Sequence, residues 1–367
     1  MGKRGIMYAA VLIPAYQPDE RLLTLAEDLA VRGLPVLVVD DGSTDHIEIF
    51  DELEAAGHPV LHHAQNRGKG AALKTGIAWL HRHGFDAVVT ADADGQHTPD
   101  DIARLLAALR ETPDRLVLGV RDVSQMPARS RFGNTLTRHL FGALYHTRVS
   151  DTQTGLRAFA LTDETVPRLD ALPGDRYEYE MEMLRDASWI WPAGIREVPI
   201  DTIYIGRNET SHFHVIRDSF RVYRVLLGSL PRFLASSVLA FVLDYGLFTL
   251  LYSLVFRHTT PATVLARLCS AGVNYQVNRR LVFPGGSPRY NLRSYVLLAA
   301  SILAANTALM YLLVEVLTLP AAPMKVIVEV VLWLASYLVQ SRLANAPTGG
   351  KCAGKPKGTA EPIQFSL

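Results

Sequence analysis

The chain has 367 residues but only two cysteines, and its acidic and basic residues nearly cancel. Cys269 and Cys352 are too few for a disulfide framework, and neither stands at metal-ligand spacing from another Cys or His. A net charge of +1 argues against nucleic acid as the main partner. No cleavable signal peptide is visible, because the first apolar run, residues 6–13, is too short for one. We therefore expect the N-terminal half to stay in the cytoplasm.

Long apolar runs are missing up to about Arg232 and are frequent beyond it. Four of these runs are each close to the ~20 residues that a helix needs to cross a bilayer. They are residues 233–256, 263–283, 295–318 and 324–343. Four spans place both ends of this segment on one side, where most of the flanking Arg and Lys residues also fall. The positive-inside rule then predicts a multi-pass protein of the inner membrane with both termini in the cytoplasm.

In the first part of the chain, short apolar segments alternate with helical patterns. The expected strands are residues 8–13, 36–39, 60–62, 87–90 and 116–118. This alternation predicts an α/β fold with a mostly parallel sheet. Ligands bind such sheets at the carboxyl ends of the strands. Four motifs stand at such ends, at Pro14, Asp40, Asp92 and Arg121, and we expect them to share one site.

Two carboxylates, Asp92 and Asp94, stand one residue apart at the end of an expected strand. Residues two apart in extended backbone point the same way, so both carboxylates can converge on one Mg²⁺ or Mn²⁺. A cation held by two carboxylates keeps positions free for the phosphate oxygens of a nucleotide diphosphate. The alternative is a strand-end turn, where Asp and Gly are common.

Two further features could bind phosphate. The segment 66–70, Asn-Arg-Gly-Lys-Gly, could offer its backbone N–H groups and Lys69, although a plain loop explains it equally well. It lacks the spacing of a P-loop. Arg121 at a strand end could clamp a phosphate, or it is an ordinary surface arginine.

Five motifs follow one another in a characteristic order, at residues 11–16, 38–45, 66–70, 91–97 and 150–157. Together they resemble glycosyltransferase family 2, and within it the dolichyl- and polyprenyl-phosphate sugar synthases. The resemblance covers about the first 215 residues. It implies a GT-A (Rossmann-like) fold and an inverting, metal-dependent transfer from a nucleotide sugar.

The resemblance also implies roles for individual residues of this sequence. Pro14, Tyr16 and one of Asp40 or Asp41 would hold the base and ribose. The metal and diphosphate would lie at Asp92, Asp94 and Gln96. Arg207 lies in a segment that matches the family's mobile loop, and like Lys69 it could reach a phosphate, although an ordinary surface-loop residue is the alternative.

Asp151 lies in the fifth motif, and the resemblance places an Asp of this region near the acceptor. If the acceptor is a sugar hydroxyl, Asp151 would be the general base. If the acceptor is a phosphate, it is already ionised, and Asp151 would instead position the metal or the acceptor, with Arg157 suited to the acceptor phosphate. An Asx-turn before Gly155 is the structural alternative. Glu182 matches a carboxylate of the synthases, and we interpret it as a structural residue or as one on the acceptor side of the site.

The segment that follows, residues 215–231, has an apolar face and an arginine-rich face. It reads as an amphipathic helix at the membrane interface, or equally as a core helix of the first domain. Motifs at residues 232–233, 244–246, 266–267 and 273–283 then resemble the GtrA-like family of four-helix membrane proteins. That family has a proposed role in moving polyprenyl-phosphate sugars across the membrane.

Two charges, Asp244 and Arg267, fall inside the expected spans, where a charge costs about 3 kcal/mol or more. We expect them to face each other or a polar cavity. They could form a path for a lipid headgroup or serve as polar glue between helices.

These observations divide the chain into four parts. We expect a catalytic domain over residues 1–214, an interfacial helix over 215–231, an all-α membrane domain over 232–343 and a disordered cytoplasmic tail over 344–367. The expected activity is transfer of a hexose from a nucleotide sugar, preferably UDP-linked, to undecaprenyl phosphate, with translocation of the product and homo-oligomerisation left open. The alternatives are a lipid-sugar translocase whose first domain only binds, and a transferase that acts on a sugar hydroxyl.

The orientation can be tested at Arg289, in the basic connection between the second and third expected spans. An Arg289→Cys variant in a chain with both native cysteines changed to Ser should react with a membrane-impermeant maleimide only after the cells are permeabilised. Labelling of intact cells would show that the four-span orientation is wrong.

Overall fold

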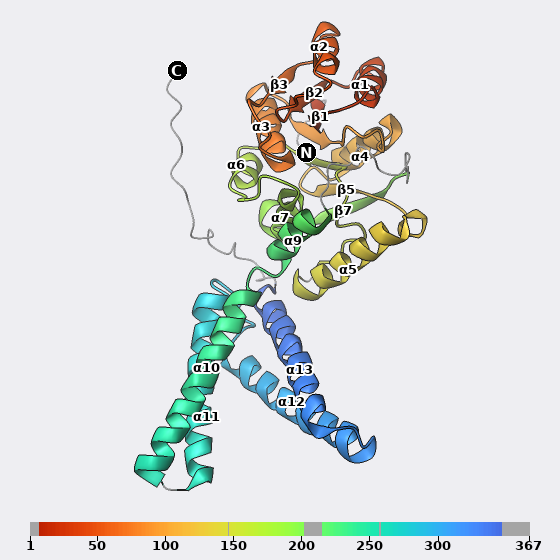
Figure 1. Ribbon diagram of the computed structural model, residues 1–367. Coiled ribbons are helices and arrows are strands. Elements are labelled where there is room, and N and C mark those ends of the chain that lie inside the picture. Colours follow the sequence, from red (N-terminus) through yellow and green to blue (C-terminus); the bar gives the residue numbers. More distant parts are fainter. Residues whose placement is uncertain (1–6, 146, 202–214, 257, 347–367) are drawn as a thin grey trace. The chain divides into compact units, whose positions relative to one another are not determined.

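The computed structural model describes residues 7–145, 147–201, 215–256 and 258–346. The chain divides into two compact units, each described here by itself (Figure 1). Of the described residues, the first unit contains 7–141, 148–201 and 215–226, and the second contains 142–145, 147, 227–256 and 258–346. Arg207 and most of the expected tail lie outside the described residues.

A seven-stranded sheet organises the first unit, with the strand order β3-β2-β1-β4-β6-β5-β7. Neighbouring strands are parallel except at β6, which is antiparallel to β4 and to β5. The mostly parallel sheet is therefore confirmed. The strands are β1 (Ala9–Ala15), β2 (Val36–Asp40), β3 (Val60–His62), β4 (Ala87–Thr90), β5 (Leu116–Val120), β6 (Arg157–Ala160) and β7 (Ile195–Pro199).

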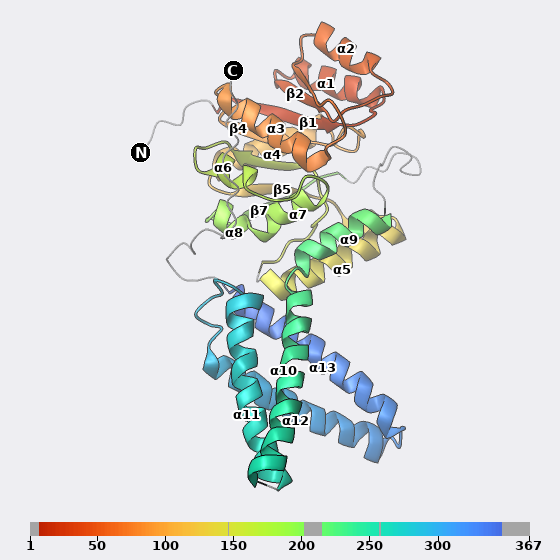
Figure 2. The same ribbon diagram turned by 60° about the vertical axis from the view of Figure 1, so that its left-hand side comes forward.

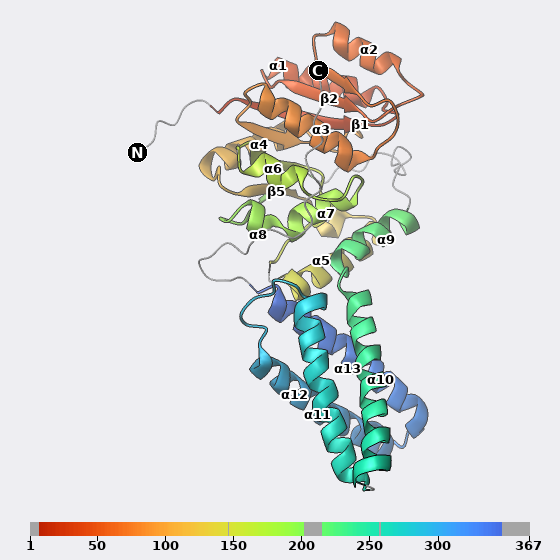
Figure 3. The same ribbon diagram turned by 90° about the vertical axis from the view of Figure 1, so that its left-hand side faces the viewer.

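Helices cover both faces of this sheet. On one face, α3, α6 and α7 lie side by side (Figure 3). On the other, apolar residues of α1, α2 and α4 form a buried core with alternate residues of β1 and β4. The helices of this unit are α1 (Arg21–Val31), α2 (Glu48–Ala55), α3 (Lys69–Arg82), α4 (Pro99–Glu111), α5 (Ala128–Tyr145), α6 (Thr165–Asp170), α7 (Glu178–Arg185), α8 (Ala187–Ile190) and α9 (Val215–Leu226), with a 3₁₀ turn, η1 (Val123–Gln125).

Local sequence explains several of these boundaries. Helix α4 begins where Thr98 accepts the backbone N–H of Asp101 at 3.1 Å, and Pro99 occupies the first helical position, where its missing N–H costs nothing. Strand β1 is buried on both faces, as expected for a central strand of a covered sheet. Its Leu12 faces α3, which can approach closely because Gly76 has no side chain.

The second unit is built from four long helices, three of which end in a π-helical turn. In Figure 2, α10 runs beside α11 and α12 runs beside α13. The elements are α10 (Leu230–Leu251), η2 (Tyr252–Phe256), α11 (Thr259–Val277), η3 (Asn278–Val282), α12 (Leu292–Met310), η4 (Tyr311–Val316) and α13 (Ala321–Ala344).

Among the described residues, three helices are long and apolar enough to cross a membrane. They cover Leu230–Val255, Leu292–Val316 and Ala321–Ala344, and each coincides with an expected span. The remaining expected span, residues 263–283, lies on α11 and η3 and is not among these candidates. The protein is thus a membrane protein with three candidate spans, and the count of four is not confirmed.

Polar side chains connect these helices. Asn274 of α11 accepts a hydrogen bond from Ser236 of α10 at 2.8 Å and donates one to Tyr295 of α12 at 3.1 Å. Asp244 faces Arg267 at 3.3 Å, as the sequence predicted. Such bonds hold apolar helices together where lipid offers no other partner.

The contact of α3 with β1 can be tested by Gly76→Ala. An added Cβ would collide with the fully buried side chain of Leu12, so the overpacking cost of about 1–3 kcal/mol should exceed the gain in helix propensity of about 1 kcal/mol. We expect a lower midpoint of thermal unfolding in detergent. Gly133→Ala is the matched control in α5, because its nearest neighbour, Gln153 Nε2, would lie 3.8 Å away. Equal midpoints for the two variants would contradict this packing.

Candidate active site

A cavity of about 490 Å³ lies at the carboxyl ends of β1, β2 and β4. It is at the position that the strand-end motifs predicted. Six of the predicted site residues line it, namely Pro14, Tyr16, Asp41, Lys69, Asp92 and Asp94. Asp40, Gln96, Arg121, Asp151 and Arg157 are not among the lining residues.

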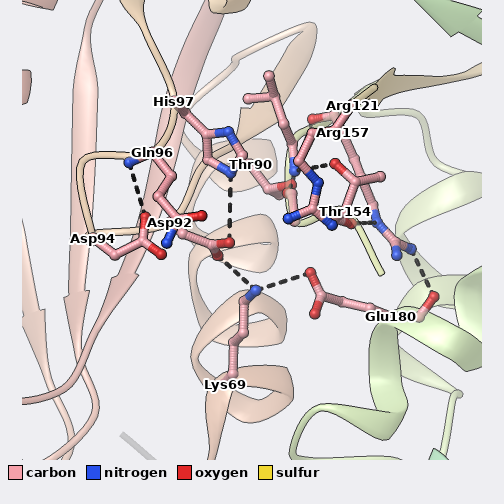
Figure 4. Close-up of polar contacts among 12 residues, drawn as sticks. Lys69, Thr90, Asp92, Asp94, Gln96, His97, Arg121, Thr154, Arg157 and Glu180 are labelled. Carbon is pink, nitrogen blue, oxygen red and sulfur yellow. Dashed lines mark hydrogen bonds and ion pairs between the residues drawn. The ribbon is translucent and has the colours of Figure 1, made fainter. Parts of the chain in front are cut away.

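The ammonium group of Lys69 lies between two carboxylates (Figure 4). Its Nζ is 2.6 Å from Asp92 Oδ1 and 3.0 Å from Glu180 Oε1. Burial disfavours the charge of Lys69, but the two carboxylates outweigh burial and raise the pKa of Lys69. Burial likewise disfavours ionisation of Asp92, but Lys69 and His97 hold the pKa of Asp92 far below its usual range. Both groups are therefore charged at neutral pH.

Glu180 was missed by the sequence reasoning, which chose Glu182 from the same segment. Both are on α7, and Glu182 instead accepts the backbone N–H of Gly174 at 2.7 Å, which is a structural role. The acidic run at residues 178–182 was the available signal. Only the packing of α7 against α3 shows which of its carboxylates reaches Lys69.

Asp94 completes the pair of carboxylates. Its Oδ1 accepts the backbone N–H of Gln96 at 3.0 Å, and its carbonyl accepts a hydrogen bond from Arg21 at 3.0 Å, so the turn is fixed. Burial, together with the negative charge of Asp92, raises the pKa of Asp94. The site therefore places two carboxylates close enough to repel each other, an arrangement that a divalent cation would stabilise.

The donor set fits Mg²⁺ or Mn²⁺. Within the described residues, no group of three His, Cys, Asp or Glu side chains is arranged to hold a metal ion. Asp92 and Asp94, which line the same cavity, would be the carboxylate ligands, with the remaining positions taken by phosphate oxygens or water, as is usual for Mg²⁺. Gln96 contributes a backbone N–H to Asp94, and its role as a metal ligand stays a prediction.

Close packing fixes the position of Asp92. A Cβ at Gly155 would come within 2.7 Å of Asp92 Oδ1, so only glycine fits there. The hydroxyl of Thr90, at the end of β4, donates to the carbonyl of Gly155 at 2.7 Å. The fourth and fifth sequence motifs are therefore attached to each other directly.

Asp41 and Asp40 have separate partners. Asp41 accepts the backbone N–H groups of Arg67 and Gly68 at 2.9 and 2.7 Å, and so it anchors the 66–70 loop. Asp40 accepts the backbone N–H of Ser43 at 2.8 Å and contacts the ring of His62. Because Asp41 occupies two of the loop's N–H groups, those two are not free to bind phosphate. Of the two aspartates, only Asp41 lines the cavity.

Asp151 is completely buried and fully engaged. It pairs with Arg121 at 2.7 Å, and it also accepts hydrogen bonds from Asn134 Nδ2 at 3.1 Å and from the backbone of Gln153 at 3.0 Å. These contacts favour a positioning role for Asp151 over that of a general base. They also engage Arg121, which was predicted to clamp a phosphate.

Arg157 is also buried, at 1% exposure. Its Nε and Nη1 donate to the carbonyls of Thr154 at 3.0 Å and Glu180 at 2.6 Å (Figure 4). Burial lowers the pKa of Arg157. In the described part of the chain, its Nη2 has no hydrogen-bond partner. Its predicted contact with an acceptor phosphate stays a prediction.

A GT-A sheet with paired aspartates after β4, followed by apolar helices, defines a membrane glycosyltransferase. Residues 10–164 match the model of glycosyl transferase family 2, and residues 232–345 match that of the GtrA/DPMS transmembrane domain. The chain belongs to glycosyltransferase family 2, with a GtrA/DPMS membrane domain, as the sequence motifs predicted.

Named relatives share the first domain. A UDP-N-acetylglucosamine–dolichyl-phosphate N-acetylglucosaminyltransferase of Methanococcus voltae is 32% identical over 59% of this chain and 94% of its own length. An undecaprenyl-phosphate mannosyltransferase of Micrococcus luteus is 34% identical over 48% of this chain and 76% of its own. A solved structure of glucosyl-3-phosphoglycerate synthase from Mycobacterium tuberculosis, with Mn²⁺ and UDP-glucose, has 21% identity and a TM-score of 0.48, over 60% of this chain and 79% of its own.

Asp151→Asn distinguishes a positioning residue from a base. Loss of the buried charge of Asp151 removes its ion pair with Arg121, which should cost about 3–5 kcal/mol of stability. Turnover per folded molecule should fall less than about tenfold, with an unchanged pH profile, whereas loss of a general base would cost about 10²–10⁴. Arg121→Met, as the matched control, should lower the unfolding midpoint to a similar degree. Loss of turnover without loss of stability would contradict the positioning role.

Proposed function

We propose that this protein transfers a hexose from a nucleotide sugar, UDP-linked, to a polyprenyl phosphate at the cytoplasmic face of the inner membrane. One observation carries the proposal: Asp92 and Asp94 face a cavity at the strand ends in a chain that also has membrane helices. The Methanococcus voltae and Micrococcus luteus relatives support it, because both are named as transferases that act on a lipid phosphate. The UDP donor is proposed from the Methanococcus voltae relative.

The residues that line the cavity divide by chemistry. Pro14, Tyr16 and Asp41 would hold the base and ribose, and Asp92 and Asp94 would hold a divalent cation. When bound, such a cation stabilises the negative charge of the leaving diphosphate. Lys69 forms an ion pair with Asp92 and so keeps this carboxylate ionised and able to bind a cation.

The acceptor phosphate is ionised at neutral pH and needs no base. One of its oxygens attacks the anomeric carbon and forms a new bond between that carbon and the phosphate oxygen. The bond from the anomeric carbon to the donor phosphate breaks, and the nucleoside diphosphate leaves with the electron pair. A single in-line displacement inverts the anomeric centre. A phosphate acceptor also agrees with the engagement of Asp151, whereas a hydroxyl acceptor would require a base.

Translocation of the lipid-linked sugar is a second candidate function, and one observation favours it. Asp244 lies on α10, a candidate span, and pairs with Arg267 of α11, which keeps 72% of its side chain exposed. A second polar group joins Asn306, Lys325 and Glu329 across α12 and α13. Charges in such helices commonly mark a substrate path. A simpler role for the same contacts is to hold the membrane helices together, with the membrane domain serving only as an anchor.

A transfer assay tests the proposal. Purified protein with Mg²⁺ or Mn²⁺ should form labelled lipid from undecaprenyl phosphate and at least one member of a panel of labelled nucleotide sugars, with UDP-sugars preferred. Asp94→Asn should abolish transfer while membrane insertion is unchanged, because one of two metal-binding carboxylates is lost. Asp100→Asn, an exposed carboxylate on α4, should stay active. If no donor gives labelled lipid, the enzyme is not a lipid-phosphate transferase.

A further inference from the structure

Helix α9 supplies one wall of the active-site cavity. Arg217, Asp218 and Arg221 all line it, together with the loop that contains Arg176. The two arginines of α9 are four residues apart and therefore share one face of the helix. That face was expected at the headgroup level of a membrane, or in the core. The helix packs against α7, the helix that carries Glu180 (Figure 2).

The four cations that line this cavity differ in what they already bind. Lys69 is held between Asp92 and Glu180, and Arg176 donates to Asn66 Oδ1 at 3.0 Å. Arg221 pairs with Asp218 at 3.0 Å, and Asp218 is only 3% exposed, so this pair is anchored in the protein. Arg217 is exposed and has no hydrogen bond or ion pair with any residue in the described ranges. Among the described lining residues, no carboxylate is seen to neutralise Arg176 or Arg217, and Arg217 is the one of these two that also makes no hydrogen bond within the protein.

The reaction brings two anions to this cavity. The donor diphosphate would lie at Asp92 and Asp94, where a divalent cation neutralises it. The acceptor phosphate needs a positive group that is not already neutralised by a carboxylate, and a guanidinium can bind a phosphate through two parallel hydrogen bonds. Three residues separate α9 from α10, a candidate membrane span. Among the elements that line the cavity, α9 is thus the one that is followed along the chain by a candidate membrane span, and a lipid acceptor resides in the membrane.

We propose that Arg217, beside the anchored pair of Arg221 and Asp218, binds the phosphate of the lipid acceptor. This inference rests on the proposed function and adds to it the residue that receives the acceptor. It also assigns α9 to the active site, whereas an interfacial helix would direct its arginines at lipid headgroups in general.

The test compares Arg217→Ala with Arg224→Ala. Arg224 is an exposed arginine on the same helix that does not line the cavity. Arg217→Ala should raise the KM for polyprenyl phosphate about ten- to hundredfold, as expected for loss of a charge-assisted phosphate contact. The Kd of UDP with Mn²⁺ should stay within about twofold of wild type. Arg217→Lys should recover part of the effect, because it keeps the charge but not the fork of donors.

Each other outcome overturns the proposal in a recognisable way. If Arg217→Ala weakens UDP binding and leaves the acceptor KM unchanged, Arg217 serves the donor diphosphate. If Arg217→Ala and Arg224→Ala raise the acceptor KM equally, α9 acts through general attraction to the membrane. Failure of the proposed function is distinct, because wild type would then make no labelled lipid. In that case, equal binding of a short-chain polyprenyl phosphate to wild type and Arg217→Ala, measured by calorimetry, would still overturn the role of Arg217.

Discussion

The ammonium group of Lys69 is the interaction on which the active site depends. It joins the first turn of α3 to the end of β4 through Asp92 and to α7 through Glu180. Three elements far apart in sequence are thereby held at one point. Loss of Lys69 would leave the charges of Asp92 and Glu180 uncompensated in a largely enclosed site, which is unfavourable. The position of Asp92 is therefore determined by the fold as well as by its own loop.

This constraint makes the two aspartates unequal. Asp92 has a cation beside it and stays ionised, whereas burial and the charge of Asp92 raise the pKa of Asp94. Lys69 can neutralise only one carboxylate of the pair. The remaining negative charge would attract a divalent cation, and the absence of a side chain at Gly155 leaves space for the carboxylate of Asp92. Under the proposed function, these contacts would hold the two carboxylates in place for a metal-bound diphosphate before it binds.

Sequence patterns predicted the features that depend on neighbours along the chain. These include the parallel strands and the strand-end position of Asp92. They did not predict β6, because Arg157–Ala160 is short and its pairing with β4 and β5 is nonlocal. For the same reason, the sequence could not show that Glu180 rather than another acidic residue of α7 meets Lys69. The burial of Asp151 and Arg157 likewise arises from tertiary contacts.

Helix α9 shows how one pattern can serve two environments. Its alternating apolar and arginine faces are equally compatible with a membrane surface and with a protein core. In the structure, the first half of the helix belongs to the protein and not to a membrane surface. Asp218 is buried there, and both Arg217 and Arg221 line the cavity. A lipid acceptor requires a site that is polar at the reacting phosphate and continuous with an apolar phase. A helix that contributes arginines to the cavity and leads within three residues into a candidate span meets both requirements.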